Sequence, residues 1–123
     1  MPKILLIEDS KTLLKHISRV LTDGGHEVVA KSTGSAAVEY LRENTVEAVL
    51  TDLYMPDTDG FEVIHHVRAL PQPPPLIVMS ACAVASGVFR DGQALGAAAS
   101  LHKPFKPEQL LSVIDDVLRS AAV

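Results

Sequence analysis

The sequence predicts an α/β fold in which a doubly wound, parallel five-stranded sheet carries helices on both faces. Two observations lead to this prediction. Short apolar runs, of the kind that a sheet buries on both faces, alternate with segments whose apolar residues recur at helical spacing. Such alternation of strand and helix is typical of a parallel sheet. With 123 residues the chain is long enough for one domain with its own core, so we expect a single (βα)5 domain over residues 1–123.

The elements follow from apolar runs, periodicity and capping residues. Ser10 offers a side-chain oxygen to the start of the first helix, and Gly24 and Gly25 end that helix. The proline-rich segment 71–75 must be an extended connection, and Pro107 suits the first turn of the last helix. The predicted strands are residues 3–7, 26–30, 46–51, 76–79 and 100–102. The first predicted helix follows Ser10, and the others occupy residues 35–43, 61–70, 84–95 and the segment from Pro107.

Composition excludes several classes of protein. Apolar residues make up 47% of the chain and charged residues 21%, which argues against disorder. The net charge of -4 argues against direct nucleic-acid binding. No apolar stretch approaches the ~20 residues that span a bilayer, and the start of the chain does not look like a signal peptide, so we expect no membrane insertion. The single cysteine, Cys82, cannot form an internal disulfide, which fits a reducing, cytoplasmic setting.

Chemically active side chains follow four of the five predicted strands. Glu8 and Asp9 come directly after the first strand, and Asp52 after the third. Ser80 closes the fourth strand, and Lys103 follows the fifth. Because the carboxyl ends of parallel strands meet at one edge of the sheet, where open α/β sheets bind ligands, we expect these groups to converge there. Three carboxylates, a hydroxyl and a lysine suit a divalent cation and a phosphoryl group.

The three carboxylates predict a metal site. Held close together they would repel, and the pKa of one would rise unless a counterion were present. Mg²⁺ removes that cost with one or two carboxylates and several waters. We predict that Asp9 and Asp52 bind Mg²⁺ directly, and Glu8 directly or through water. The alternative is that Glu8 and Asp9 merely end a strand and cap a helix; the presence of Asp52 and Lys103 favours the metal site.

Asp52 is the candidate nucleophile, because a carboxylate can attack phosphorus and form an acyl phosphate. Phosphoryl transfer needs positioning and charge neutralisation more than a strong base. Lys103 can reach the phosphoryl oxygens as a point charge, and the Ser80 hydroxyl can donate to one of them. The alternatives are that the Ser80 hydroxyl merely bonds to the backbone and that Lys103 is a solvated surface lysine. Pro104 follows the lysine, and a cis bond there would turn the chain back toward the cleft.

The order and spacing of five motifs carry a family resemblance. They are Ile7-Glu8-Asp9-Ser10, Thr51-Asp52-Leu53-Tyr54-Met55-Pro56, Asp59-Gly60, Met79-Ser80-Ala81 and Lys103-Pro104-Phe105. Over essentially its whole length the chain resembles the receiver domain of bacterial response regulators. The resemblance implies the flavodoxin-like strand order 2-1-3-4-5. It also implies that a sensor histidine kinase or histidine phosphotransfer protein phosphorylates Asp52, that Asp9, Asp52 and the Tyr54 backbone carbonyl bind Mg²⁺, and that Ser80 and Lys103 contact the phosphoryl group.

The resemblance leads us to expect a switch in two-component signalling. Such a protein transfers the phosphoryl group to itself and slowly hydrolyses the product, without being a metabolic enzyme. Phosphorylation would change its binding to a downstream protein target. We expect a stand-alone regulator, although a receiver domain cut from a larger regulator or a hybrid kinase would look the same.

The chain departs from the family pattern at Ser100, where receiver domains usually carry an aromatic residue three positions before the lysine. The usual coupling of hydroxyl and ring is therefore absent or rebuilt from other side chains. Residues 81–99 are poor in charge, and this surface either docks a partner or a second copy, as in a homodimer, or is a small-residue helix packed on the sheet.

Two other functions remain open at this stage. A receiver-shaped interaction module that works without phosphorylation would be natural if Asp52, Asp9 or Lys103 were missing. An aspartyl phosphatase often carries a second acid two residues after the nucleophile, where this chain has Tyr54.

Overall fold

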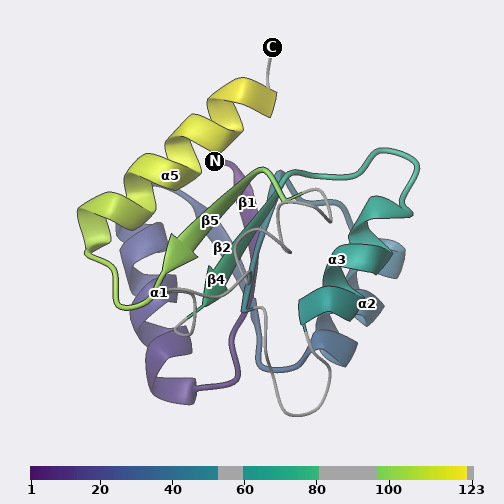
Figure 1. Ribbon diagram of the computed structural model, residues 1–123, viewed down its shortest axis with the longest axis horizontal. Coiled ribbons are helices and arrows are strands. Elements are labelled where there is room, and N and C mark those ends of the chain that lie inside the picture. The colour runs from purple at the N-terminus through teal and green to yellow at the C-terminus, as the bar shows by residue number, and fades with distance from the viewer. Residues whose placement is uncertain (53–59, 81–96, 122–123) are drawn as a thin grey trace.

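The computed structural model describes residues 1–52, 60–80 and 97–121 and contains a parallel sheet with the strand order β2-β1-β3-β4-β5 (Figure 1). The strands are β1 (Lys3–Ile7), β2 (Glu27–Lys31), β3 (Ala48–Asp52), β4 (Leu76–Ser80) and β5 (Ala99–His102). The described helices are α1 (Lys11–Asp23), α2 (Gly34–Glu43), α3 (Gly60–Arg68) and α5 (Pro107–Ala121). The predicted parallel five-stranded sheet and its order 2-1-3-4-5 are confirmed.

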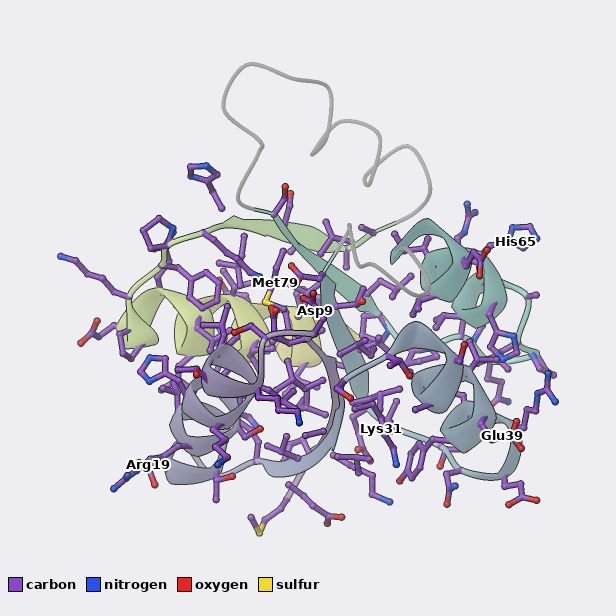
Figure 2. All side chains as sticks on the ribbon, turned by 90° about the horizontal axis from the view of Figure 1, so that it is seen from below. Asp9, Arg19, Lys31, Glu39, His65 and Met79 are labelled. Atoms are coloured by element: carbon purple, nitrogen blue, oxygen red, sulfur yellow. The ribbon has the colours of Figure 1, made fainter. Side chains whose placement is uncertain are left out.

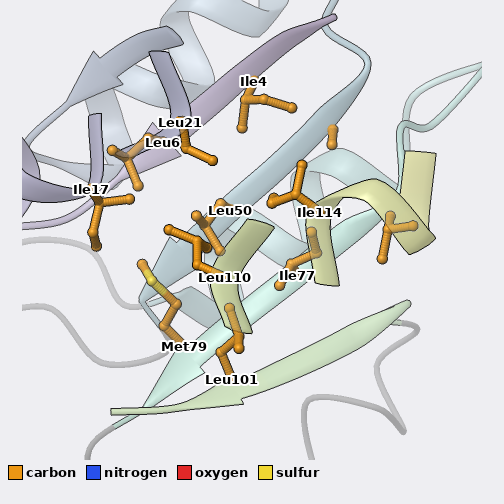
Figure 3. Packing of buried hydrophobic residues seen from close by; sticks show 12 residues of the cluster. Ile4, Leu6, Ile17, Leu21, Leu50, Ile77, Met79, Leu101, Leu110 and Ile114 are labelled. Atoms are coloured by element: carbon orange, nitrogen blue, oxygen red, sulfur yellow. The ribbon is translucent and has the colours of Figure 1, made fainter. Parts of the chain in front are cut away.

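The sheet separates two apolar cores, because alternate residues of each strand point to opposite faces. Ile4 and Leu6 of β1 pack with α1 and α5 on one face, where Ile17 and Ile114 belong to the same cluster (Figure 3). Leu5 of β1 packs on the other face with residues of α2 and α3. Figure 1 shows the same layering, with α1 and α5 on one side of the sheet and α2 and α3 on the other. The fold is therefore doubly wound, as predicted.

Helix α1 begins and ends as the sequence predicts. The Ser10 hydroxyl accepts a hydrogen bond from the Leu13 N–H at 3.3 Å. The helix ends at Asp23, and two residues later Gly25 adopts a left-handed backbone conformation with φ 93°, which glycine accepts readily. At Gly24 a Cβ would lie 2.5 Å from a methyl carbon of Leu111 on α5, so the end of that leucine side chain would have to move to admit it. The end of α1 therefore packs closely against α5.

Several predicted boundaries were wrong by one or two residues. The second strand begins at Glu27 and ends at Lys31, because pairing with β1 starts at Lys3↔Glu27 and the N–H of His26 instead bonds to the carbonyl of Leu21. The third strand begins at Ala48, opposite Ile4, and includes Asp52. The fourth strand extends by one residue to Ser80 and the fifth begins one residue earlier, while the third helix ends at Arg68, two residues before the predicted Leu70.

The structure confirms one further prediction, a cis bond before Pro104, and does not describe the segment of another, the fourth helix. The Lys103–Pro104 peptide bond is cis. The predicted helix at residues 84–95, together with Cys82, lies outside the described residues, and so does most of the charge-poor segment 81–99. No helix within the described ranges is long and apolar enough to cross a membrane.

Candidate functional site

The predicted side chains do gather at the carboxyl edge of the sheet. Glu8 follows β1, Asp52 ends β3, Ser80 ends β4 and Lys103 follows β5. The strand register aligns these positions, since Asp52 lies opposite Met79 on β4. In Figure 1 the arrowheads of β4 and β5 point toward this edge, and Figure 2 views the molecule from that side, with Asp9 near the middle.

Lys103 lies between two buried carboxylates. Its Nζ is 2.6 Å from Oε2 of Glu8 and 2.7 Å from Oδ1 of Asp52. Only 1% of the Glu8 side chain and 8% of the Asp52 side chain is exposed, against 15% for Lys103. The N–H of Lys103 donates to the Ser80 carbonyl at 2.9 Å, which ties its backbone to the end of β4. The N–H of Ser10 donates to Oε1 of Glu8 at 3.1 Å, so both oxygens of Glu8 are held.

Asp9 completes an acidic cluster at the carboxyl edge of the sheet. Glu8, Asp9 and Asp52 each offer one oxygen, and these three atoms lie within 4.8 Å of one another. Asp9 is exposed, whereas the other two acids are buried. The structure thus places the three predicted metal ligands and the predicted lysine close together at one edge of the sheet, with one acid facing solvent.

The surroundings of the two buried carboxyl groups move their pKa values in opposite directions. Burial and a shared hydrogen bond with Glu8 raise the pKa of Asp52 to about 7, although Lys103 opposes the rise. Burial also disfavours the charged form of Glu8, but hydrogen bonds from Asp52, Lys103 and the Ser10 N–H outweigh it, and the pKa of Glu8 lies below its ordinary value. Near neutral pH Glu8 is therefore ionised, whereas Asp52 is only partly so.

Lys103 keeps its positive charge in this setting. Burial alone would lower its pKa, but the neighbouring Asp52 and Glu8 carboxylates prevail and raise the pKa above the ordinary value. A lysine that stays charged beside a partly buried acid is suited to neutralising an oxyanion close to Asp52.

Of three other positions singled out in the sequence, the structure locates two, and the third lies outside the described residues. Ser80 is buried at the end of β4, on the same edge as Asp52. The carbonyl of Tyr54, predicted to bind metal, lies outside the described residues. Ser100, at the position of the usual aromatic residue, is half-buried on β5 opposite Val78.

One contact was missed by the sequence reasoning. The Thr51 hydroxyl donates to the backbone carbonyl of Asp52 at 2.9 Å and is fully buried. It holds the end of β3, just where the chain presents the Asp52 side chain. The signal was a hydroxyl residue at the end of an otherwise apolar strand.

Comparison with known proteins assigns the family. The family model for the response regulator receiver domain matches residues 4–115. Chemotaxis protein CheY of Bacillus subtilis is 31% identical over 117 residues, which cover 94% of this chain and 97% of CheY. The structure of chemotaxis response regulator CheY4 of Vibrio cholerae superposes with a TM-score of 0.87 at 30% identity, covering 95% of this chain and 98% of CheY4. The chain therefore belongs to the response regulator receiver domain family.

Other relatives are much longer proteins. Response regulator protein FleR of Pseudomonas aeruginosa is 34% identical over 114 residues, which cover 91% of this chain and only 24% of FleR. The family assignment therefore covers the receiver unit of such proteins. It does not assign the activity of the rest of FleR to this chain.

Proposed function

We propose that this chain is a phosphoacceptor switch in two-component signalling. Asp52 would take a phosphoryl group from a phosphohistidine of a sensor histidine kinase or a histidine phosphotransfer protein. The observation that carries the proposal is the position of the Lys103 ammonium, 2.7 Å from Oδ1 of Asp52 and 2.6 Å from Oε2 of Glu8 at the carboxyl edge of the sheet. Membership of the receiver family supports it, and we extend the receiver domain to residues 1–123.

The proposed step forms one bond and breaks another. An Oδ atom of Asp52 attacks phosphorus, the nitrogen–phosphorus bond of the donor breaks, and the imidazole nitrogen keeps the electron pair and takes a proton. Lys103 turns its positive charge toward the phosphoryl oxygens, and the Ser80 hydroxyl donates to one of them. The product is an acyl phosphate on Asp52, which water slowly hydrolyses.

Mg²⁺ fits the donor set of this acidic cluster. Asp9 and Asp52 would hold the ion, with Glu8 binding directly or through water, and the Tyr54 carbonyl remains a predicted ligand. Their oxygens are the hard ligands that Mg²⁺ prefers, they lie within 4.8 Å of one another, and exposed Asp9 leaves the cluster open to solvent. When bound, the ion neutralises charge that builds on the phosphoryl oxygens.

Mg²⁺ binding is tested by its effect on unfolding. A ligand at 100 times its Kd stabilises the folded state by about 2.7 kcal/mol, so saturating Mg²⁺ should raise the melting temperature of the wild type. Asp9→Asn should lose most of that rise. Glu47→Gln, which alters an exposed acid at the opposite edge of the sheet, should keep it. An equal rise in all three proteins would contradict the site.

The phosphoryl group would act by shifting populations. It adds about -2 charge and favours whichever conformer can bond it, so a downstream protein target would bind the two forms differently. Ser100 leaves no ring at the usual position, so we propose that side chains other than an aromatic residue carry the readout. Pairing of two copies through the segment 81–99 remains a prediction on residues that the structure mostly does not describe.

Phosphorylation is tested by intact mass. Incubation with acetyl phosphate and Mg²⁺ should add one phosphoryl group to the wild type and none to Asp52→Asn. Absence of the added mass in the wild type would favour the receiver-shaped module that works without phosphorylation. Multiple turnover on phosphate monoesters would instead favour the aspartyl phosphatase.

A further inference from the structure

A buried hydroxyl lies next to the proposed phosphoacceptor. Thr51 is fully buried in β3, directly before Asp52. Its neighbours in register are Ile7 of β1 and Val78 of β4, and both belong to the apolar core between the sheet and helices α2 and α3. Val49, two residues earlier on β3, belongs to the same core. Thr51 is therefore the polar member of an otherwise apolar row.

Burial of this hydroxyl has a cost that apolar packing does not offset. A hydroxyl gives up its hydrogen bonds to water when it enters a core, whereas valine has a similar branched shape and loses none. The Thr51 hydroxyl recovers one hydrogen bond, which it donates to the backbone carbonyl of Asp52 at 2.9 Å. The contact with Asp52 is therefore what a threonine provides at this position and a valine would not.

The hydrogen bond acts where the chain leaves the sheet. Asp52 is the last residue of β3, and it still pairs in register with Met79 of β4. A hydrogen bond to its carbonyl limits rotation about the bond between Cα and the carbonyl carbon of Asp52. The Cα atom is thus held by strand pairing on one side and by the Thr51 hydroxyl on the other. The same atom sets the point from which the carboxylate reaches Nζ of Lys103, 2.7 Å away.

The Thr51 side chain lies on the face of the sheet opposite to the Asp52 side chain. Adjacent side chains of a strand point to opposite faces, so Thr51 shares the α2 and α3 side with Val49. Asp52 shares the other side with Leu50, which packs with α1 and α5 (Figure 3). The hydroxyl therefore acts through the main chain of Asp52, which makes Thr51 a positioning residue and not a catalytic one.

We propose that the Thr51 hydroxyl positions the Asp52 carboxylate for attack on phosphorus. The proposal rests on the proposed function. Phosphoryl transfer depends mostly on placing the attacking oxygen in line with the bond that breaks. A misplacement of about 1 Å costs an enzyme roughly a hundredfold in rate. Loss of one hydrogen bond to the main chain should displace the carboxylate by less, so we expect a smaller but measurable loss of rate.

The test separates the hydroxyl from the shape of the side chain. Thr51→Val removes the hydrogen bond and keeps the branched shape, whereas Thr51→Ser keeps the hydroxyl and removes the methyl group. Thr22→Val is the matched control, because the Thr22 hydroxyl also donates to a backbone carbonyl, that of Ser18 at 2.8 Å, but lies in the last turn of α1. Thr51→Ala removes both groups and takes the place of the valine variant if that variant does not fold.

We expect Thr51→Val to take label from acetyl phosphate about tenfold more slowly than the wild type in saturating Mg²⁺, and Thr51→Ser and Thr22→Val to stay within about twofold of it. Phosphoramidate, a second small donor, should give the same ratio, because the defect lies in the acceptor. Thermal unfolding of each variant confirms that it is folded at the temperature of the assay. A wild-type rate in Thr51→Val, or an equal loss in Thr51→Val and Thr51→Ser, would overturn the proposal.

A measurement without phosphoryl transfer separates this proposal from the proposed function. The NMR signals of the backbone carbonyl carbon and the side-chain carboxyl carbon of Asp52 should both shift in Thr51→Val and return to the wild-type positions in Thr51→Ser. A shift of the backbone signal alone would leave the carboxylate in place and overturn the proposal. If the wild type takes no label from either donor, the proposed function fails, and the carboxyl signal then decides the positioning by itself.

Discussion

The two ends of β1 each hold a lysine close to two carboxylates, yet the two clusters differ in kind. At the amino end, Nζ of Lys3 is 4.0 Å from Oε2 of Glu27, and the Lys3 N–H donates to Glu47. At the carboxyl end, Lys103 is 2.6 Å from Glu8 and 2.7 Å from Asp52. A lysine and two acidic residues thus lie together at each of two opposite edges of one sheet.

Burial accounts for the difference. The side chains of Lys3 and Glu27 are 32% and 57% exposed, whereas Glu8 and Asp52 are nearly covered. Exposed ion pairs add little to stability, because water screens both charges. Buried charges must be compensated by partners, and removing one partner strands the other. The amino-end cluster is therefore an ordinary surface ion pair. The carboxyl-end cluster keeps charges buried despite their desolvation cost, which points to a functional role.

Of the substitutions in the two clusters, Lys103→Met should change the stability most. It leaves Glu8 and Asp52 facing each other without their shared cation, and we expect a loss of about 3–5 kcal/mol in the free energy of unfolding at pH 8 without metal. The loss should shrink at pH 5, where Asp52 holds a proton. Urea unfolding measures both values. Lys106→Met, three residues along and exposed, is the control, and an equal loss at the two pH values would contradict the account.

Asp52→Asn should have a smaller effect of the opposite sign. The pKa of Asp52 rises on folding from its ordinary value of 3.8 to about 7, so the folded state holds a proton that the unfolded state releases. The wild type should therefore lose stability as the pH rises from about 4 to about 7, and the variant should lack that loss.

Above pH 7, in metal-free buffer, Asp52→Asn should consequently be the more stable protein by at least about 1 kcal/mol, the equivalent of roughly one pKa unit. Urea unfolding of both proteins across pH 4–8 checks this. If the free energies of unfolding of wild type and variant changed with pH in parallel, burial would not raise the pKa of the Asp52 carboxyl group. Saturating Mg²⁺ should reduce the advantage of the variant, since the ion supplies the missing counter-charge.

Lys3→Met, in the amino-end cluster, should have the smallest effect on stability. Its partner Glu27 is well exposed and remains hydrated when the lysine is gone. We expect a shift in melting temperature below about 2 °C, with the same pH dependence as the wild type. Thermal unfolding at pH 5 and pH 8 provides the measurement. A loss as large as that of Lys103→Met would mean that burial does not separate the two clusters.

Much of the fold could be predicted because its signals are local. The apolar run at residues 3–7 and the Ser10 cap lie where they were expected. Boundaries failed where pairing between strands decided them, as at Glu27, where the ladder with Lys3 begins one residue after the predicted start. The candidate site was predictable as a set, because parallel strands bring their carboxyl ends to one edge.

The amino-acid pattern alone was enough to predict the alternation of strand and helix, helices on both faces of the sheet and the gathering of Glu8, Asp9, Asp52 and Lys103 at one edge. How those charges are shared follows from the folded arrangement. Lys103 bonds Glu8 as closely as Asp52, across 95 positions of sequence, and Glu8 is pushed toward ionisation while Asp52 is pushed away from it. Spacing along a chain cannot encode that division, because it depends on the distances and the burial that appear only when distant strands meet.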